Sequence, residues 1–315
     1  MRLFRNVALG AASLALVLSA CTPGGGSTPA PTGSVASNLV LAGPPECPER
    51  PFCLLGLRET YELEFKEFRP TDPGGPLTVA ALKSDEAQVG LLFTSDPAIA
   101  VNDFVLLEDD RGLQLADNII PVLRQDVLDA SPGVADALNL VMERLTQDEL
   151  IALNRAAGVD LKPIPDVARE WITAQGFDTI SGVTGPITVG STNFPEQVVL
   201  GEIFAQVLEG SGADVERRFE LGNREIVFPA LESGEIDVLA EYAATVLEHA
   251  NDQAGEATDD ADETAAALRE RLEPLGLTAL DPAPATDQNG FVVTRATADR
   301  YGLSKLSDLA KPASG

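Results

Sequence analysis

Short apolar runs alternate with longer amphipathic runs along most of the chain, and two stretches carry this alternation in the same order. The first passes from LVLAG through LEFKEF to VGLLF, and the second from ITVG through VERRFEL to IDVLAEY. In both stretches, polar loops and runs with helical spacing separate the apolar runs, so each predicts a βαβαβ unit with parallel strands. The spans agree in length, since Gly43 to Phe93 is 50 residues and Gly190 to Tyr242 is 52. We interpret them as corresponding parts of two similar α/β lobes; chance similarity of two α/β units is the alternative.

Three helices are predicted between the two units. Ser131-Pro132 is a good N-cap and N1 pair, TQDE at 146–149 is a capping box, and 163–175 carries Trp171 on its apolar face. A helical tail of this kind normally ends a domain. The segment that follows it, ITVGSTNFPEQ, is instead typical of the opening of a mature exported domain, which belongs just behind a signal peptide. The order of elements therefore places a domain opening in the middle of the chain.

The N-terminal segment predicts export and lipidation. A start with two arginines precedes an apolar run, 7–18, that is too short to span a bilayer as a stable helix, and LSA then precedes Cys21. This order resembles a bacterial lipobox, in which Cys21 becomes the lipidated first residue; an ordinary signal peptide with a chance cysteine is the alternative. We assign 1–20 to a lipoprotein signal peptide and 21–37, rich in Pro, Gly, Ser and Thr, to a flexible tether. The acyl chains would anchor the protein to the cell membrane on its extracytoplasmic face.

Charge and cysteine usage exclude several classes of function. The net charge of −27 argues against nucleic acid as a partner; it mildly favours cationic small molecules, although solubility explains it more simply. In an exported chain Cys47 and Cys53 are expected to form a disulfide, with two reduced thiols as the alternative. The single histidine, His249, cannot supply a triad or a metal site, so we expect no metal, no cofactor and no enzyme activity.

The span 38–315 resembles the substrate-binding proteins of ABC importers for quaternary ammonium osmoprotectants, namely glycine betaine, choline and carnitine. The resemblance is carried by ITVGSTNFPEQVVLGEIFAQVLE, FPALESGEIDVLAEY, LDPAPATDQNGFVVT, ATADRYGLSKLSDLA, GGPLTVAALKS and FVLLEDDRGLQLADNIIPVLR. The order differs from that of the family, because 38–177 look like its C-terminal portion and 186–315 like its N-terminal portion. We interpret the chain as a circular permutant. The alternative, two truncated copies, would leave an open apolar face on half a sheet.

The resemblance implies an α/β, two-lobed fold of the type II periplasmic binding protein kind, here in circularly permuted order. One lobe should be split, built from 38–108 plus 290–315, and the other continuous, 109–289. The ligand cleft should lie between the lobes at the carboxyl ends of the parallel strands. Closure of the lobes is expected about a hinge near 106–109 and 288–291.

Aromatic rings are the expected contacts for a trimethylammonium group, which cannot donate hydrogen bonds but is attracted by a ring face. The two matched strands end in Phe93 and Tyr242, which in a two-lobed clamp would face each other across the cleft. Both could instead be core aromatics. Tyr242 also matches a cage tyrosine of the resembling family.

Polar ligand contacts are expected from two other places. Thr192 and Asn193 lead into a helix with Pro195 near N1, where free backbone N–H groups would suit a ligand carboxylate. Gln197 and Thr245 match family ligand contacts; each of these polar residues could instead be a surface residue or a helix cap.

The ligand cage predicted by the resemblance is thinner than is usual in the family. Asn289 stands at a position where the family has a cage tyrosine, and Asp117 stands near the position of another cage tyrosine. A carboxylate at Asp117 or Asp287 would favour choline or another cation over zwitterionic betaine.

The function implied by the resemblance is a lipid-anchored solute receptor that delivers a quaternary amine to the ABC permease subunit in the membrane. Two alternatives remain open at this point. One is a binding protein for a different small polar or cationic ligand, and the other is a sensor without a role in transport.

Overall fold

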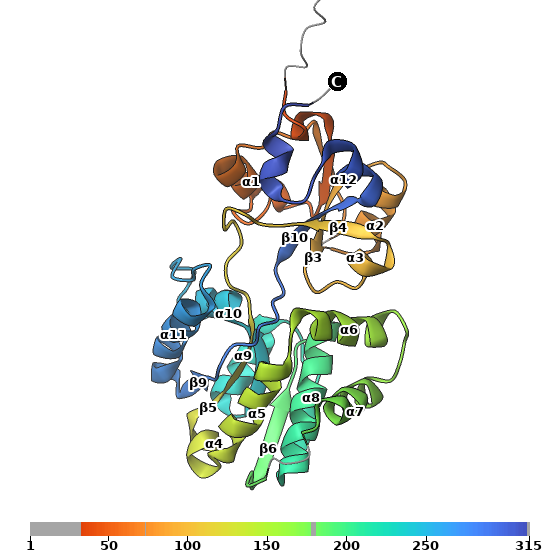
Figure 1. The fold of residues 1–315 in the computed structure, drawn as a ribbon. Coiled ribbons are helices and arrows are strands. Elements are labelled where there is room, and N and C mark those ends of the chain that lie inside the picture. Colours follow the sequence, from red (N-terminus) through yellow and green to blue (C-terminus); the bar gives the residue numbers. More distant parts are fainter. Residues whose placement is uncertain (1–32, 73, 178–180, 314–315) are drawn as a thin grey trace, which may run out of the picture.

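The computed structural model describes residues 33–72, 74–177 and 181–313, which form two α/β lobes, each built on a five-stranded sheet (Figure 1). The predicted two-lobed α/β fold class is confirmed. The predicted signal peptide, Cys21 and most of the predicted tether lie outside the described residues. Within the described ranges, no helix combines the length and apolar character needed to cross a membrane.

The split lobe takes its strands from two distant parts of the chain. Its sheet has the order β2-β1-β3-β10-β4, in which β1, β2 and β3 are parallel and β10 runs antiparallel to both of its neighbours. The strands are β1 Val40–Gly43, β2 Glu67–Pro70, β3 Val89–Phe93, β4 Phe104–Leu107 and β10 Asn289–Thr294, and the α-helices are α1 Leu54–Tyr61, α2 Pro76–Lys83, α3 Ala98–Val101 and α12 Arg295–Tyr301.

The continuous lobe repeats the same sheet plan. Its order is β7-β6-β8-β5-β9, with β6 parallel to β7 and β8, and with β5 antiparallel to β8 and β9. The strands are β5 Ile119–Arg124, β6 Pro186–Gly190, β7 Asp214–Arg218, β8 Val238–Tyr242 and β9 Leu277–Ala279; the helices are α4 Gln125–Ala130, α5 Gly133–Arg144, α6 Gln147–Gly158, α7 Ile164–Gln175, α8 Pro195–Ser211, α9 Arg224–Ser233, α10 Ala243–Ala250 and α11 Ala261–Leu272. The matched phrases ALKSDEAQVGLLF and ALESGEIDVLAEY thus run from the end of α2 through β3 and from the end of α9 through β8, which occupy equivalent places in the two lobes.

Local sequence explains where the central helix of the continuous lobe begins and ends. Pro195 begins α8, where its fixed φ suits a first helical turn and no hydrogen bond is lost. Gly212 ends it with φ 117°, in the left-handed region that glycine adopts without a Cβ clash. The apolar face of α8 packs with α5 and α7 on one side of the sheet, while α9, α10 and α11 bury the other side.

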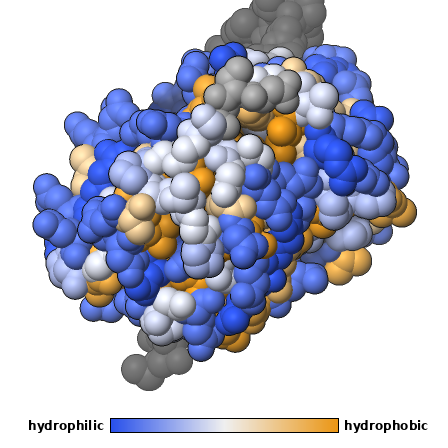
Figure 2. Space-filling model, turned by 90° about the horizontal axis from the view of Figure 1, so that it is seen from below, coloured by the Kyte–Doolittle hydropathy of each residue, from blue (hydrophilic) through white to orange (hydrophobic). Residues whose placement is uncertain are grey.

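The two ends of the described chain lie side by side on the split lobe, at the end of the molecule far from the continuous lobe (Figure 1). The backbone N–H of Val35 donates to the Lys311 carbonyl at 2.9 Å, and that of Ala313 donates to the Gly33 carbonyl at 3.0 Å. The predicted tether therefore extends too far: Val35 is 2% exposed, because this apolar residue packs into the core of the split lobe. The opposite end of the molecule presents mainly hydrophilic residues, with hydrophobic ones scattered among them (Figure 2).

Two segments, 108–118 and 280–288, connect the lobes (Figure 1). The predicted hinge, near 106–109 and 288–291, overlaps both connecting segments at 108–109 and 288, whereas 106–107 and 289–291 lie in strands that are hydrogen-bonded within the split-lobe sheet. β10 is hydrogen-bonded to strands on both of its sides and β4 to a strand on one side, and these bonds resist the backbone rotation that lobe closure requires. We therefore expect the lobes to move about the connecting segments.

The Asp109 carboxylate fixes the start of the first connecting segment on the split lobe. It accepts hydrogen bonds from the Tyr61 hydroxyl at 2.5 Å and from the backbone N–H of Gln114 at 2.7 Å. Two residues further on, the N–H of Ala116 donates to the Thr258 carbonyl of the continuous lobe at 2.8 Å. The passage from one lobe to the other thus falls between 114 and 116.

Candidate ligand-binding cleft

A cavity of about 520 Å³ lies where the two lobes meet. Phe93 and Tyr242, the last residues of β3 and β8, place it at the carboxyl ends of parallel strands from both lobes. It is lined by Arg50, Phe52, Phe93, Gln114, Leu115, Asp117, Phe194, Arg224, Tyr242, Ala244, Thr245, Glu248, Gln253, Asp287, Gln288 and Asn289. Of the predicted site residues it brings together Phe93, Asp117, Tyr242, Thr245 and Asn289, but not Thr192, Asn193 or Gln197.

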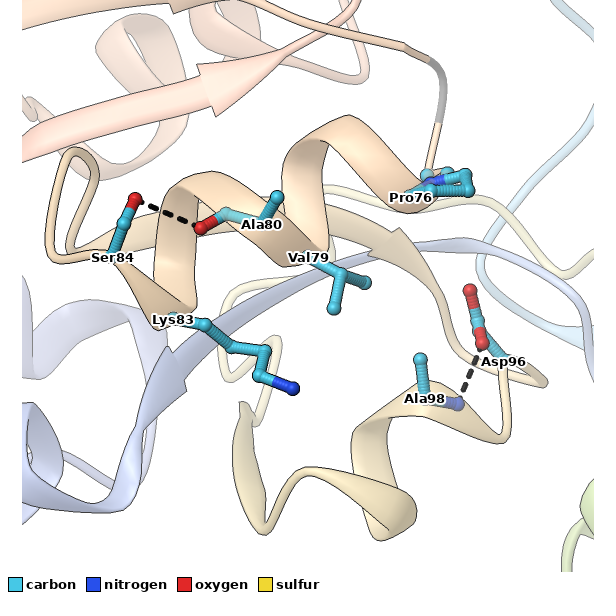
Figure 3. A pocket seen from close by; sticks show the side chains of 9 residues that line it. Pro76, Val79, Ala80, Lys83, Ser84, Asp96 and Ala98 are labelled. Atoms are coloured by element: carbon cyan, nitrogen blue, oxygen red, sulfur yellow. Dashed lines mark hydrogen bonds between the residues drawn. The ribbon is translucent and has the colours of Figure 1, made fainter.

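A second hollow, of about 690 Å³, lies within the split lobe between α2 and α3 (Figure 3). Val79 and Lys83 of α2 line one side, and on the other the Asp96 carboxylate accepts a hydrogen bond from the Ala98 N–H at 2.7 Å. Its lining among the described residues includes no aromatic ring and no predicted site residue. We therefore take the cavity between the lobes, called the cleft below, as the candidate site.

Three aromatic rings form a row across the cleft. The ring centroids of Phe93 and Phe194 are 6.1 Å apart, and those of Phe194 and Tyr242 are 6.4 Å apart. Phe93 and Tyr242 were predicted to face each other, but Phe194 lies between them and joins the two lobes. The face of an aromatic ring, where its quadrupole is negative, attracts a large cation, so rings that line a partly enclosed cavity suit such a ligand wherever a face is open to it.

The Tyr242 ring is held in place by a buried carboxyl group. Its hydroxyl donates to Glu196 Oε1 at 2.8 Å, and Glu196 Oε2 accepts from Asn154 Nδ2 at 2.5 Å. Burial raises the pKa of Glu196, and burial together with the Glu196 carboxyl raises the pKa of the Tyr242 phenol well above its usual value. The phenol thus stays neutral and acts as a donor to Glu196.

Carboxyl groups face the cleft from both connecting segments. Asp117 accepts hydrogen bonds from the Thr245 N–H at 2.8 Å and from the Thr245 hydroxyl, which gives Thr245 a positioning role. Burial raises the pKa of Asp117 to about 6. Asp287 accepts a hydrogen bond from the Ser95 hydroxyl at 2.7 Å; burial, with the nearby Glu196 carboxyl, raises its pKa to about 8.

Arg224, one of two arginines that line the cleft, is committed to a buried partner. It forms a two-point ion pair with Glu241, with Nε to Oε1 at 2.9 Å and Nη2 to Oε2 at 2.6 Å, and the Glu241 side chain is 0% exposed. Its positive charge is therefore largely neutralised, and the carboxyl groups of the cleft outnumber the arginines.

The loop that leads into α8 does not present the free N–H groups that were predicted for it. The Thr192 N–H donates to Gln197 Oε1 at 3.2 Å, the Asn193 N–H to the Gly222 carbonyl at 2.8 Å, and the Phe194 N–H to Thr192 Oγ1 at 3.2 Å. In this conformation the N–H groups of residues 192–194 are therefore engaged by protein acceptors and are not free for a ligand carboxylate; an anion site here stays a prediction. The same bonds fix the backbone that carries the Phe194 ring.

Cys47 and Cys53 form a disulfide in the structure, and the loop that it closes lies at the rim of the cleft. The loop contributes Arg50 and Phe52 to the lining, and its Phe52 carbonyl accepts from Asn289 Nδ2 at 3.3 Å. The contact ties the predicted Asn289 to the rim.

Sequence reasoning missed Phe194, Glu196 and Ser95. A signal for Phe194 was present, since it follows β6 at the same sheet edge as Tyr242 and stands at the N-cap of a helix. No motif pointed to Ser95 or Glu196, because their importance arises from contacts between distant segments.

The fold and the cleft define a two-lobed solute-binding protein. The chain belongs to the family described as the substrate-binding domain of ABC-type glycine betaine transport systems, whose profile matches residues 30–174 and 185–315. This family consists of substrate-binding transport proteins rather than enzymes.

Several relatives match one part of the chain. The glycine betaine-binding protein YehZ of Escherichia coli is 33% identical over 129 residues, which cover 40% of this chain and 42% of that protein. The carnitine transport binding protein OpuCC of Listeria monocytogenes is 25% identical over 38% of each chain, and a glycine-betaine-binding protein of Pseudomonas aeruginosa is 29% identical over 43% of this chain and 44% of its own. The chain thus spans about two fifths of the length of the curated relatives it matches.

Solved structures of binding proteins align with most of the chain at low sequence identity. The apo form of YehZ covers 88% of this chain and 86% of its own, with 12% identity and a TM-score of 0.39. A structure titled as a glycine betaine/carnitine/choline ABC transporter covers 87% of this chain and 90% of its own, with 10% identity and a TM-score of 0.38.

Proposed function

We propose that this chain is an extracytoplasmic solute-binding receptor of an ABC importer and that its ligand is a small quaternary ammonium compound such as choline, glycine betaine or carnitine. The observation that carries the proposal is the row of Phe93, Phe194 and Tyr242, with one ring from the split lobe and two from the continuous lobe. A trimethylammonium group among these rings gains cation–π attraction while giving up only weak hydration. Because both lobes contribute, ligand binding favours the closed arrangement that a permease subunit would recognise.

The polar residues of the cleft take defined parts in this proposal. Asp117, positioned by Thr245, and Asn289 line the cavity beside the rings and would contact the rest of the ligand. Gln197, Thr192 and Asn193 would act indirectly, because their hydrogen bonds hold the backbone that positions the Phe194 ring.

Binding is tested by thermal unfolding and calorimetry of the described domain with choline, glycine betaine, carnitine and spermidine. A ligand at a hundred times its dissociation constant should stabilise the fold by about 2.7 kcal/mol. The matched control is 3,3-dimethylbutan-1-ol, which has the shape of choline without its charge and should stabilise far less. If none of the quaternary amines stabilises a well-folded protein, the ligand class is wrong; stabilisation by spermidine alone would reassign the cleft to another kind of cation.

The proposal includes a lipid anchor at Cys21, supported by the order of basic start, apolar run and cysteine in the sequence. We expect a Cys21→Ala chain to lose acylation and to leave the membrane fraction. Fractionation of the expressing cells, with a fatty-acid label, measures both. Ser27→Ala, a change in the tether six residues beyond, is the control and should stay at the membrane; a Cys21→Ala chain that remains there with its label would contradict the anchor.

The proposal also holds that the chain is circularly permuted. The family profile matches it in two segments, and the ends of the split lobe are hydrogen-bonded to each other. A reordered chain that runs from 181 to 313 and then, through a short linker, from 33 to 177 should fold and bind the same ligand with unchanged affinity, because adjacent surface ends can be joined at little cost. The control is a chain opened between Leu239 and Ala240, inside β8, which should not fold. A reordered chain that fails like this control would contradict the permutation.

A further inference from the structure

One residue from each lobe and one from a connecting segment meet at the inner end of the cleft. Ser95 follows β3 of the split lobe and is 2% exposed, Glu196 stands in the first turn of α8 of the continuous lobe and is 3% exposed, and Asp287 lies on the second connecting segment. Asp287 lines the cleft itself, and Glu196 bonds the Tyr242 ring that lines it. We call these three residues the carboxyl pair and its bridging serine.

One hydrogen-bond network joins the two carboxyl groups. The Ser95 hydroxyl donates to Asp287 Oδ1 at 2.7 Å, while Asn154 Nδ2 donates to the Ser95 carbonyl at 3.2 Å and to Glu196 Oε2 at 2.5 Å. Both carboxyls therefore lie in the immediate surroundings of Ser95, where two ionised groups would repel each other. Because Glu196 already accepts from Tyr242 and Asn154, it is the better site for the negative charge.

No cation among the described residues is placed to compensate two charges at this point. The carboxyls that act on Asp287 are those of Glu196 in α8 and Asp117 on the first connecting segment. The other titratable groups that line the cleft are Tyr242 of β8, Arg224 of α9, Glu248 of α10 and Arg50 at the rim. Arg224 is engaged by Glu241 at two points. Two like charges in a partly buried site repel strongly enough that one takes up a proton.

We infer that Glu196 and Asp287 share one proton whenever the closed cleft holds no cation, and that a ligand with a net positive charge takes the place of that proton. The inference rests on the proposed function and narrows its ligand class to monocations of the choline type. A zwitterion such as glycine betaine leaves the proton in place, since its own carboxylate balances its ammonium group. It also finds no free donor in the loop before α8, whose N–H groups are already bonded.

The consequence is a difference of one proton between two complexes. The choline complex should hold one proton fewer than the glycine betaine complex. The ratio of choline to glycine betaine affinity should then rise about tenfold per pH unit while the carboxyl pair is protonated, and should level off above the pKa of Asp287, about 8. The sign is fixed, because a lower pH favours whichever complex keeps the proton.

The experiment is calorimetric titration of the full folded domain with choline and with glycine betaine, in buffers of different ionisation enthalpy, from pH 7 to 9, where Asp117, with a pKa of about 6, is already ionised. We expect a difference of about one proton and a pH-dependent affinity ratio. Asp287→Asn should abolish the proton difference and the pH dependence of the affinity ratio, and it should bind choline more weakly. Ser95→Ala should reduce both effects. The control is Asp281→Asn, which should behave as the parent chain. Asp281 is an exposed residue of the same connecting segment, and its side chain pairs with Arg269.

The outcomes separate this inference from the proposed function. If choline and glycine betaine bind with equal proton exchange and a constant affinity ratio, the inference fails while the receptor function stands. If Asp287→Asn does not fold, the inference stands only if the parent chain shows the proton difference and Ser95→Ala reduces it. If no quaternary amine binds the parent chain, the proposed function fails and the inference fails with it.

Discussion

Replacing Arg224 with alanine is expected to lower the free energy of unfolding by about 3–5 kcal/mol, the range found when one partner of a buried ion pair is removed. Glu241 has 0% exposure, and Arg224 neutralises it through two hydrogen bonds at 2.9 and 2.6 Å. Without the guanidinium, the fully buried Glu241 carboxylate has no counter-charge. Since a domain is stable by only about 5–15 kcal/mol, the variant should unfold at a clearly lower urea concentration.

Two control variants isolate the cause of this loss. Arg218→Ala removes an exposed pair with Glu216 from the same lobe and should leave the free energy of unfolding almost unchanged, because solvent screens the pair. The double change Arg224→Met with Glu241→Gln removes both charges and should recover a large part of the stability. If Arg224→Ala is no less stable than Arg218→Ala, the buried pair contributes little to the stability of the fold.

The parts of the fold that could be predicted from sequence are those set by local spacing. Apolar runs at the right lengths, with Pro195 before the long helix, indicated both βαβαβ units because strand and helix periods differ within a few residues. The equivalence of β3 and β8 followed from the matched phrases that end in Phe93 and Tyr242. Since parallel strands end at one sheet edge, the position of the cleft also followed.

The parts that could not be predicted depend on contacts between distant residues. Val35 belongs to the lobe and not to the tether because its N–H bonds the carbonyl of Lys311, at the other end of the chain. The N–H groups before α8 are occupied because the Gln197 side chain turns back to Thr192, a choice of rotamer that no spacing encodes. Glu196 appeared as an ordinary first-turn acidic residue, and only the folded chain brings it to Tyr242.

Replacing Phe194 with leucine is expected to weaken choline binding about thirtyfold while leaving the fold intact. Phe194 is the middle ring of the row, with centroid distances of 6.1 Å to Phe93 and 6.4 Å to Tyr242. Leucine keeps most of the apolar volume but has no π face, so the loss should equal the cation–π attraction of a desolvated ring, about 2 kcal/mol. Calorimetric titration with choline measures it.

The neutral isostere of choline shows whether the loss comes from charge. Binding of 3,3-dimethylbutan-1-ol should change by less than about threefold in Phe194→Leu, because that ligand gains nothing from the ring quadrupole. Phe177→Leu alters an aromatic residue that packs on Trp171, outside the cleft, and should leave both affinities unchanged. An equal loss for choline and the isostere would mean that Phe194 acts only by shape, and unchanged choline affinity would remove the ring from the site. Either result would separate the aromatic row from cation recognition and leave the carboxyl groups as the source of any preference for charge.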